Sequence, residues 1–263
     1  MIPKKIHLCW LSGDEYPPLI EYCINTWRKI LPDYEIVLWD TKRFDINSVN
    51  WAKEAFELKK YAFAADYIRF YALYTEGGIY LDSDVEVLKS FNDLLSCKSF
   101  IGFEASTGNY EAAIVGSEPG MQWCKNILDF YKDKHFSLDI ISSDILAPIV
   151  VEKGLRLEYK EELPTESPRA PIWLDNGNFV VYPAEYFSPI KNDIEKSYSE
   201  NKRAKNMYRK NKNTYCIHRF NASWTVRPSR EIQMWDWFKR TLNSVLGEKV
   251  SLWIINFIRK IFR

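Results

Sequence analysis

The first forty residues contain a strand, a helix and a second strand in close succession, and this order restricts the fold more than any other feature of the sequence. Lys5–Trp10 has the pattern of a strand, Pro17 and Pro18 open a helical pattern that runs to Leu31, and Tyr34–Trp39 is again strand-like. Proline suits the first turn of a helix, because the amide hydrogen that it lacks would have no partner there. A strand, a helix and a strand at this spacing form a βαβ unit and predict a parallel sheet. We therefore expect an α/β fold.

The rest of the chain continues the alternation of helices and strands. Residues 61–75 combine Ala, Leu and aromatic residues at helical spacing, and Gly77–Gly78 end this helix before a short apolar strand at 79–81. The pattern predicts further strands at 100–103, 112–115, 179–182 and 215–218, helices at 120–132 and 139–151, an ordered loop at 163–178, and helical structure from 229 onward. We expect one α/β domain over residues 1–228 and a helical extension over 229–263.

Charge and cysteine content restrict the class of protein. The chain has 36 basic and 35 acidic residues, so no overall positive field favours a nucleic-acid partner. Its five cysteines include no Cys-x-x-Cys pair, which argues against a disulfide framework or a zinc site and predicts a reducing, cytoplasmic location. The N-terminus is too short before its first apolar run for a signal peptide, and no stretch approaches the ~20 apolar residues that span a bilayer. We expect a soluble protein, or a peripheral one on the inner face of the cell membrane.

A pair of carboxylates follows the strand at 79–81. Asp82 and Asp84 are two positions apart, so their side chains project to the same side of an extended chain. Apolar residues flank the pair, which indicates burial, and buried carboxylates need a neutralising partner. A hard divalent cation such as Mg²⁺ or Mn²⁺ prefers oxygen ligands and supplies that charge. The segment therefore predicts a metal site at the carboxyl end of a strand, where α/β sheets bind their ligands.

Asp66 and Arg69 lie three positions apart on the preceding helix and so share one of its faces. Their small and apolar neighbours indicate that this helix is largely buried. Two interpretations remain open. The residues form a local ion pair, or they offer hydrogen bonds to the phosphate and hydroxyls of a nucleotide-sugar.

Four groups of residues occur together: Lys5-Ile6-His7 with Trp10 and Gly13, Ala65-Asp66 with Arg69, Gly77-Gly78-Ile79-Tyr80-Leu81-Asp82 with Asp84, and His218 with Ser223-Trp224. In combination they resemble glycosyltransferase family 32, which includes bacterial capsular polysaccharide transferases and fungal mannosyltransferases. They are also similar to the glucosylating domain of the large clostridial toxins. The resemblance covers residues 2–90 and, more weakly, residues 215–225.

The resemblance implies a GT-A fold, with a mixed sheet flanked by helices, and a nucleotide-sugar donor that reacts with retention of anomeric configuration. The residues that it matches to donor contacts are Trp10, Asp66, Arg69, Tyr80, Ser83, Ser223 and Trp224. Trp10 matches an aromatic residue that stacks on the nucleotide base, which favours UDP. Ser223 and Trp224 match a C-terminal element that closes over the diphosphate.

The resemblance also implies a Mn²⁺ or Mg²⁺ ion at Asp82 and Asp84, with Asp84 the more direct ligand. His218 has two interpretations: a satisfied histidine at a strand end, or the third metal ligand that related transferases place here. We favour the ligand. His7, inside the first strand, is expected to be structural.

The implied reaction moves a hexose or N-acetylhexosamine to a glycan acceptor in capsular, exopolysaccharide or O-antigen synthesis. No residue is recognisable as a nucleophile, so we expect electrostatic catalysis in which the metal, Arg69 and the C-terminal element with Ser223 and Trp224 stabilise the departing diphosphate. Asp144, Glu104 and Asn109 are candidates for contacts with the donor sugar or the acceptor. Each is equally compatible with an ordinary cap or turn.

Two basic segments near the C-terminus suggest partners. Residues 202–212 carry six basic and no acidic side chains, which suits either a solvated loop or a lid over a lipid-diphosphate-linked acceptor. The tail at 249–263 is basic and amphipathic. It predicts either contact with an anionic membrane or packing on the protein's own core or on a second copy.

Two other functional classes compete with the transferase. The apolar-Asp-x-Asp-Val segment also resembles the nucleophile strand of haloacid-dehalogenase-like phosphatases, in which Asp82 and Asp84 would do the chemistry. That motif normally ends the first strand of its domain, whereas a βαβ unit precedes it here. A non-catalytic carbohydrate-binding protein would use the aromatic residues, 16% of the chain, but gives no reason for buried carboxylates beside Arg69.

Overall fold

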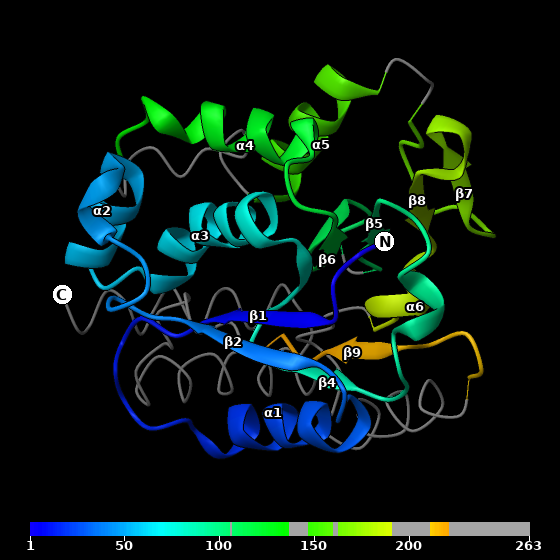
Figure 1. The fold of residues 1–263 in the computed structure, drawn as a ribbon, viewed down its shortest axis with the longest axis horizontal. Coiled ribbons are helices and arrows are strands. Elements are labelled where there is room, and N and C mark those ends of the chain that lie inside the picture. The colour runs from blue at the N-terminus through cyan, green and yellow to red at the C-terminus, as the bar shows by residue number, and fades with distance from the viewer. Residues whose placement is uncertain (106, 137–146, 160–162, 191–210, 221–263) are drawn as a thin grey trace, which may run out of the picture. The chain divides into compact units, whose positions relative to one another are not determined.

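A seven-stranded mixed sheet forms the centre of the protein (Figure 1). The computed structural model describes residues 1–105, 107–136, 147–159, 163–190 and 211–220. The strand order is β2-β1-β3-β6-β5-β8-β7. The strands are β1 (Lys5–Cys9), β2 (Glu35–Trp39), β3 (Gly78–Leu81), β5 (Ser99–Phe103), β6 (Tyr110–Ser117), β7 (Ile172–Leu174) and β8 (Phe179–Tyr182). A separate two-stranded ribbon pairs β4 (Val85–Val87) with β9 (Cys216–His218).

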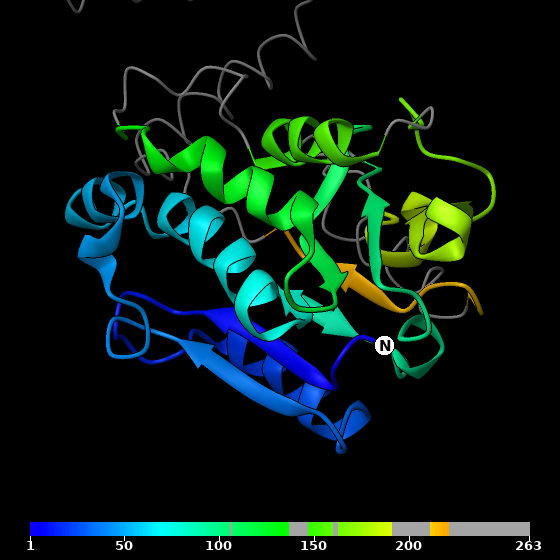
Figure 2. The same ribbon diagram turned by 45° about the horizontal axis from the view of Figure 1, so that its top comes forward.

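Helices cover both faces of the sheet, as Figures 1 and 2 show. The helices are α1 (Pro18–Ile30), α2 (Asn50–Glu57), α3 (Tyr61–Glu76), α4 (Gln122–Lys132), α5 (Ala147–Glu158) and α6 (Ala184–Phe187). Helices α3, α4 and α5 lie on one side of the sheet, while α1 and the β4–β9 ribbon lie on the other. This mixed sheet between helical layers confirms the expected fold class.

The alternation of side chains along the strands divides the core between these two faces. Ile79 and Leu81 of β3 pack into the cluster on the α1 side, whereas Tyr80 packs into the cluster on the α3 side. Trp27 of α1 is wholly buried, and its indole nitrogen donates a hydrogen bond to the Val85 carbonyl oxygen at 2.7 Å. Burial of a side chain of this size contributes about 3 kcal/mol. The ribbon strand β4 is therefore held firmly beneath the sheet.

Strand β3 lies at the boundary between the parallel and antiparallel parts of the sheet. It runs parallel to β1, with His7 opposite Tyr80, and antiparallel to β6, with Leu81 opposite Ile114. The carboxyl end of β3 consequently meets the carboxyl end of β1 and the amino end of β6. Residues from three separate parts of the chain are brought to one edge of the sheet in this way.

The expected βαβ unit is confirmed in β1, α1 and β2, and the expected helix at 61–75 is α3. Other expectations were incomplete. The segment 163–178 contains β7 and a 3-10 turn at Asp175–Gly177, and neither α2 nor β4 was expected. Helix α5 continues to Glu158, beyond the expected end at residue 151, because Gly154 does not end it. A Cβ at Gly154 would lie 2.5 Å from Ile127 Cγ1, so the glycine permits close packing of α5 on α4. Residues 139–146 of the expected helix lie outside the described residues.

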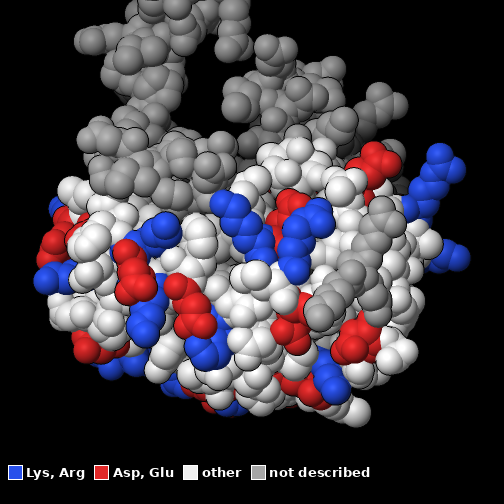
Figure 3. Space-filling model, turned by 90° about the horizontal axis from the view of Figure 1, so that it is seen from above, with Lys and Arg blue, Asp and Glu red and all other residues white. Residues whose placement is uncertain are grey.

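Residues 1–221 form one compact unit. The expected boundary at residue 228 stays a prediction, and the expected extension at 229–263 lies outside the described residues. Within the part of the chain that is described, no helix is long and apolar enough to cross a membrane. Basic and acidic side chains are interspersed on the face seen in Figure 3.

Candidate functional site

The joint between α3 and β3 requires two glycines. Gly77 has φ 63° and Gly78 has φ 113°, a backbone region that side chains with a Cβ rarely adopt. A Cβ on Gly77 would lie 2.6 Å from Pro119 Cδ, and one on Gly78 would lie 2.8 Å from the Lys5 carbonyl oxygen. The Gly77-Gly78 pair therefore allows α3 to turn directly into the central strand, which fixes α3 beside the residues that follow β3.

Arg69 of α3 lies between two carboxylates. Its Nη2 is 3.0 Å from Asp66 Oδ1 and 3.4 Å from Asp82 Oδ1, and its Nη1 donates to the Ala112 carbonyl oxygen at 2.5 Å. The guanidinium is 4.8 Å from the ring centroid of Tyr80, whose hydroxyl donates to Asp82 Oδ1 at 2.9 Å. The expected pair Asp66 and Arg69 is thus joined to Asp82 of the metal motif in one largely buried network. Arg69 Nε has no hydrogen-bond partner among the described residues.

His218 reaches the same edge through the β4–β9 ribbon. The antiparallel register places His218 opposite Val85, and the Arg219 amide continues the ladder by donating to the Asp84 carbonyl oxygen at 3.1 Å. Arg219 also pairs with Glu86, which is buried, at 3.1 Å. The ribbon therefore sets His218 next to the carboxylate that precedes β4.

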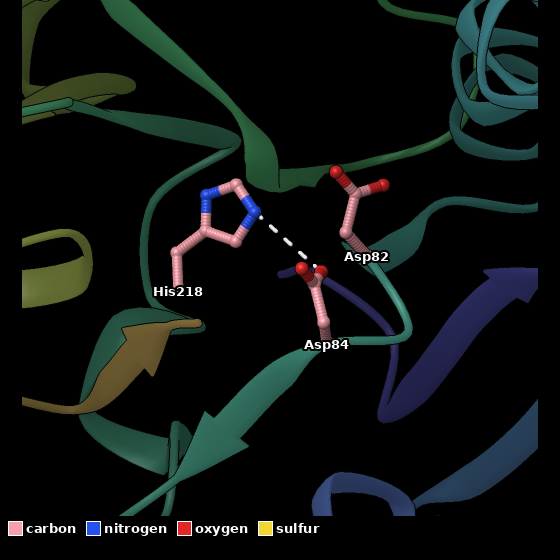
Figure 4. Close-up of side chains that lie close together, drawn as sticks. All are labelled: Asp82, Asp84 and His218. Carbon is pink, nitrogen blue, oxygen red and sulfur yellow. Dashed lines mark ion pairs between the residues drawn. The ribbon is translucent and has the colours of Figure 1, made fainter. Parts of the chain in front are cut away.

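Asp82, Asp84 and His218 converge on one point (Figure 4). Each offers a ligand atom that lies within 4.8 Å of the other two, and His218 Nε2 is 3.5 Å from Asp84 Oδ1. Two carboxylates and an imidazole form a donor set that Mn²⁺ accepts. The structure thus brings together the three residues that were expected to bind a metal, and their role as ligands stays a prediction.

The sequence did not single out Glu111, which lies at the start of β6. It is 1% exposed, and its Oε2 is 3.7 Å from His218 Nδ1. Together with His218 and Glu104 it forms a second group whose ligand atoms lie within 4.8 Å. A signal was present, because a charged residue within the otherwise apolar run from Tyr110 to Val115 is unusual in a buried strand. Glu104 was expected as a sugar or acceptor contact, and that role is untested.

Burial changes the proton affinity of these groups. It raises the pKa of Asp66 to about 7 and raises the pKa of Asp82, although Arg69 opposes both shifts. Burial and the neighbouring Glu111 raise the pKa of Glu104 to about 7. These carboxylates ionise reluctantly because burial removes them from water, and the neighbouring positive charge compensates only in part. A divalent cation would supply the missing charge.

His218 and Glu111 show the opposite behaviour. Burial alone would lower the pKa of His218, but Asp84 and Glu111 outweigh it and raise the pKa well above its usual value. Burial alone would raise the pKa of Glu111, but His218 and the hydrogen bonds from Ser188 and Ala113 lower it. In the absence of a metal, the imidazolium therefore provides part of the positive charge at this edge.

His7 has the structural position that was expected. It is fully buried, its Nδ1 accepts from Trp39 Nε1 at 2.9 Å, and its Nε2 lies 2.6 Å from the Gly77 carbonyl oxygen. Because Trp39 can only donate, the proton of His7 resides on Nε2 and is donated to Gly77. Burial lowers the pKa of His7, so the ring is neutral.

The remaining expected site residues are Trp10, Ser83, Ser223 and Trp224. Trp10 directly follows β1, its Nε1 donates to the Asp14 carbonyl oxygen at 2.7 Å, and its ring contacts Tyr16 edge-on at 5.0 Å. Ser83 lies between the two aspartates and is partly buried. Ser223 and Trp224 lie outside the described residues, as do Asp144, most of the basic segment 202–212 and the tail at 249–263.

Comparison with known proteins gives matches to glycosyltransferases. An uncharacterized glycosyltransferase of Acanthamoeba polyphaga mimivirus is 34% identical over 129 residues, which are 45% of this chain and 51% of that protein. Inositol phosphoceramide mannosyltransferase 3 of Schizosaccharomyces pombe is 28% identical over 146 residues, which are 51% of this chain and 40% of that protein. This chain therefore spans about half the length, or less, of these two relatives.

Among solved structures, the PaToxG glycosyltransferase is similar with a TM-score of 0.48 and 20% identity, over 60% of this chain and 69% of the other. A glycosyltransferase involved in glycosylation of the major capsid of PBCV-1 is similar with a TM-score of 0.41 and 16% identity, over 84% and 95% of the two chains. A family model described as the glycosyltransferase sugar-binding region containing the DXD motif matches residues 17–101. The narrower resemblance to family 32 stays a prediction. Residues 17–101, which include Asp66, Arg69, Asp82 and Asp84, therefore resemble the DXD-containing sugar-binding region of glycosyltransferases.

Proposed function

We propose that the protein is a metal-dependent, retaining glycosyltransferase that moves a hexose or N-acetylhexosamine from a nucleotide-diphosphate sugar to a glycan acceptor. One observation carries the proposal: Asp82, Asp84 and His218, from two distant parts of the chain, offer ligand atoms within 4.8 Å of one another. The sugar-binding region matched at residues 17–101 contains both aspartates. The convergence of these residues is what a metal-assisted departure of a diphosphate requires.

The residues at this edge fit Mn²⁺ or Mg²⁺. Asp82, Asp84 and His218 supply hard oxygen atoms and one imidazole nitrogen. Burial raises the pKa of Asp82, and a bound cation would favour its ionised form. A bound divalent cation would act as a Lewis acid on the departing diphosphate. The three side chains would hold it on the same edge of the sheet as Arg69.

Arg69 has a second role in this proposal. Its contacts with Asp66, Asp82 and the Ala112 carbonyl oxygen fix the guanidinium in place before any ligand binds. A cation held in this way stabilises negative charge without reorganising, which is the basis of electrostatic catalysis. Asp66 and Tyr80 position Arg69 and Asp82, and Trp10 lies at the end of the neighbouring strand, where it would stack on the nucleotide base.

The donor and acceptor are proposed more broadly. Trp10 favours a UDP-sugar, while the name of the Schizosaccharomyces pombe mannosyltransferase makes GDP-mannose a second donor to test. The acceptor would be a glycan, free or linked to a lipid diphosphate, in capsular, exopolysaccharide or O-antigen synthesis. Location in the cytoplasm, with contact to the membrane through residues 249–263, completes the proposal.

A screen of nucleotide-sugars for metal-dependent hydrolysis tests this function without a known acceptor. Purified protein is incubated with UDP- and GDP-sugars, with Mn²⁺ or with a chelator, and released nucleotide is measured. We expect hydrolysis of one donor that needs the metal and falls at least ~100-fold in Asp84→Asn. The matched control is Asp33→Asn, an exposed aspartate that pairs with Lys4, and it should retain full activity.

Three outcomes contradict the proposal. Hydrolysis that is unchanged in Asp84→Asn would remove the metal site from the mechanism. Cleavage of a simple phosphoester, with no nucleotide-sugar hydrolysed, would favour the phosphatase. Sugar binding without metal-dependent binding of UDP or GDP in calorimetry would favour a carbohydrate-binding protein.

A further inference from the structure

Each ring nitrogen of His218 lies near a different carboxylate. Nε2 is 3.5 Å from Asp84 Oδ1, on the side of the proposed cation, and Nδ1 is 3.7 Å from Glu111 Oε2. Nδ1 is buried and has no hydrogen-bond partner among the described residues. An imidazole that gives the lone pair of one nitrogen to a metal carries its proton on the other nitrogen. The residue that accepts this proton decides which nitrogen faces the metal.

Glu111 is fixed so that one of its oxygen atoms faces His218. Its Oε1 accepts from the Ala113 amide at 2.8 Å, and its Oε2 accepts from the Ser188 hydroxyl. Ser188 is fully buried and forms a β-bridge with Glu104, so its position is set by the backbone. The carboxylate of Glu111 therefore cannot rotate away from the imidazole without breaking a hydrogen bond.

Glu104, Glu111 and His218 also offer ligand atoms within 4.8 Å of one another, as a second metal site would require. The two groups share His218, which cannot give Nδ1 to a second metal while that nitrogen carries the proton that Nε2 coordination requires.

We propose that Glu111 is a positioning residue. It accepts a hydrogen bond from Nδ1–H of His218 and thereby directs the Nε2 lone pair toward the cation held with Asp82 and Asp84. The inference rests on the metal dependence in the proposed function. It adds a carboxylate–histidine–metal arrangement in which the carboxylate comes from β6, the histidine from β9 and the aspartates from the turn after β3. Ser188 and the Ala113 amide hold the carboxylate in place.

The test is the affinity of the full chain for Mn²⁺, measured by paramagnetic resonance of the free ion. We expect one ion per chain in the wild type and a roughly 10- to 100-fold weaker affinity in Glu111→Gln, because the amide cannot accept from all three donors. Ser188→Ala, which leaves the carboxylate but removes one of its restraints, should weaken binding in the same direction by a smaller factor. Glu104→Gln removes a negative charge near His218 and should weaken binding less than Glu111→Gln does. The matched control is Glu76→Gln, a glutamate that pairs with Lys5 and Arg43 before the start of β3, and it should change the affinity by less than about 3-fold.

The tautomer of His218 gives a second readout that loss of packing alone would not produce. In the Mg²⁺-loaded protein, ring-nitrogen chemical shifts should show the proton of His218 on Nδ1, whereas His7 shows its proton on Nε2 and serves as an internal reference. In Glu111→Gln the His218 signals should become those of a mixture of tautomers while those of His7 stay unchanged. If Glu111→Gln does not fold, Ser188→Ala carries both measurements.

The outcomes separate this inference from the proposed function. Wild-type affinity and an unchanged His218 tautomer in both Glu111→Gln and Ser188→Ala would overturn the positioning role alone. Two ions per chain, with one lost in both Glu104→Gln and Glu111→Gln, would overturn it in favour of a second metal site. Failure of the wild type to bind Mn²⁺ would overturn the metal dependence as well.

Discussion

Arg69 and His218 hold comparable places in two parts of the site, because each lies between two carboxylates. Arg69 is 3.0 and 3.4 Å from Asp66 and Asp82, whereas His218 is 3.5 and 3.7 Å from Asp84 and Glu111. An arginine keeps its charge at any physiological pH, but an imidazolium can release its proton. The first part of the site therefore keeps its positive charge at any physiological pH. In the second part, the positive charge can be exchanged for a metal.

Removal of the charge of Arg69 should have the largest effect on stability. Arg69→Met leaves Asp66 and Asp82 buried without their cation, so the free energy of unfolding of the metal-free protein should fall by about 3–5 kcal/mol. Urea unfolding at pH 7 measures it. Arg28→Met, at an exposed position of α1, is the control and should change stability by less than about 0.5 kcal/mol. Equal losses in the two variants would show that Arg69 is not a structural cation.

The pH dependence of stability should differ between the part of the site around Arg69 and the part around His218. Burial raises the pKa of Asp66 to about 7 from 3.8, so ionising it costs free energy in the folded state. Asp66 should reduce the stability of the metal-free protein as pH rises from about 4 to about 7, by at most about 4 kcal/mol. Asp66→Asn should lack this decrease. A difference in unfolding free energy between wild type and variant that stays constant over this range would contradict the prediction.

His218 should act in a different range of pH. Its pKa is raised well above 6.5, so the stabilisation by its imidazolium is complete below about pH 6.5 and is lost as pH rises through the higher folded value. At neutral pH, Mn²⁺ should replace this proton. At 100 times its dissociation constant, Mn²⁺ should raise the free energy of unfolding by about 2.7 kcal/mol. His218→Gln should retain only a minor part of that gain, and full stabilisation in this variant would exclude His218 as a ligand.

The smallest effect should come from removal of the Tyr80 hydroxyl, which links the part of the site around Arg69 to Asp82 of the metal motif. Tyr80→Phe keeps the ring beneath Arg69 but removes the hydrogen bond to Asp82. We expect a loss of about 1.5 kcal/mol in unfolding free energy, the lower end of the range for a hydrogen bond to a charged group, because Asp82 is partly exposed. Tyr22→Phe, which removes the hydroxyl that donates to Glu86, is a matched comparison. A loss near zero in Tyr80→Phe would mean that Arg69 alone satisfies Asp82.

The part of the site around Arg69 could be predicted from the sequence because its residues are close together in the chain. Helical spacing places Asp66 and Arg69 on one face, strand alternation places Asp82 and Asp84 on one side, and Gly77-Gly78 mark the joint. Those rules operate over a few residues. The sequence could not show that Arg69 contacts Ala112 or that Arg69 lies between two carboxylates, because both depend on how α3 packs on the sheet.

The part around His218 depends on pairings between distant strands, which the sequence patterns did not reveal. The antiparallel register of β3 and β6 brings Glu111 to the site, and the sequence gives no indication of that direction. Strand β4 is three residues long and follows the metal motif directly, so no periodic pattern marks it. His218 was identified through a family resemblance, and its geometric reason is its position opposite Val85.

The β4–β9 ribbon has a consequence for how the protein is made. Glu86 and Arg219, which pair beside the ribbon, are 133 residues apart, so the chain must be synthesised almost to residue 220 before His218 can approach Asp84. During synthesis, Asp82 and Asp84 are added to the chain long before His218. A metal ion that binds tightly only to all three ligands would therefore bind only after the β4–β9 ribbon has formed.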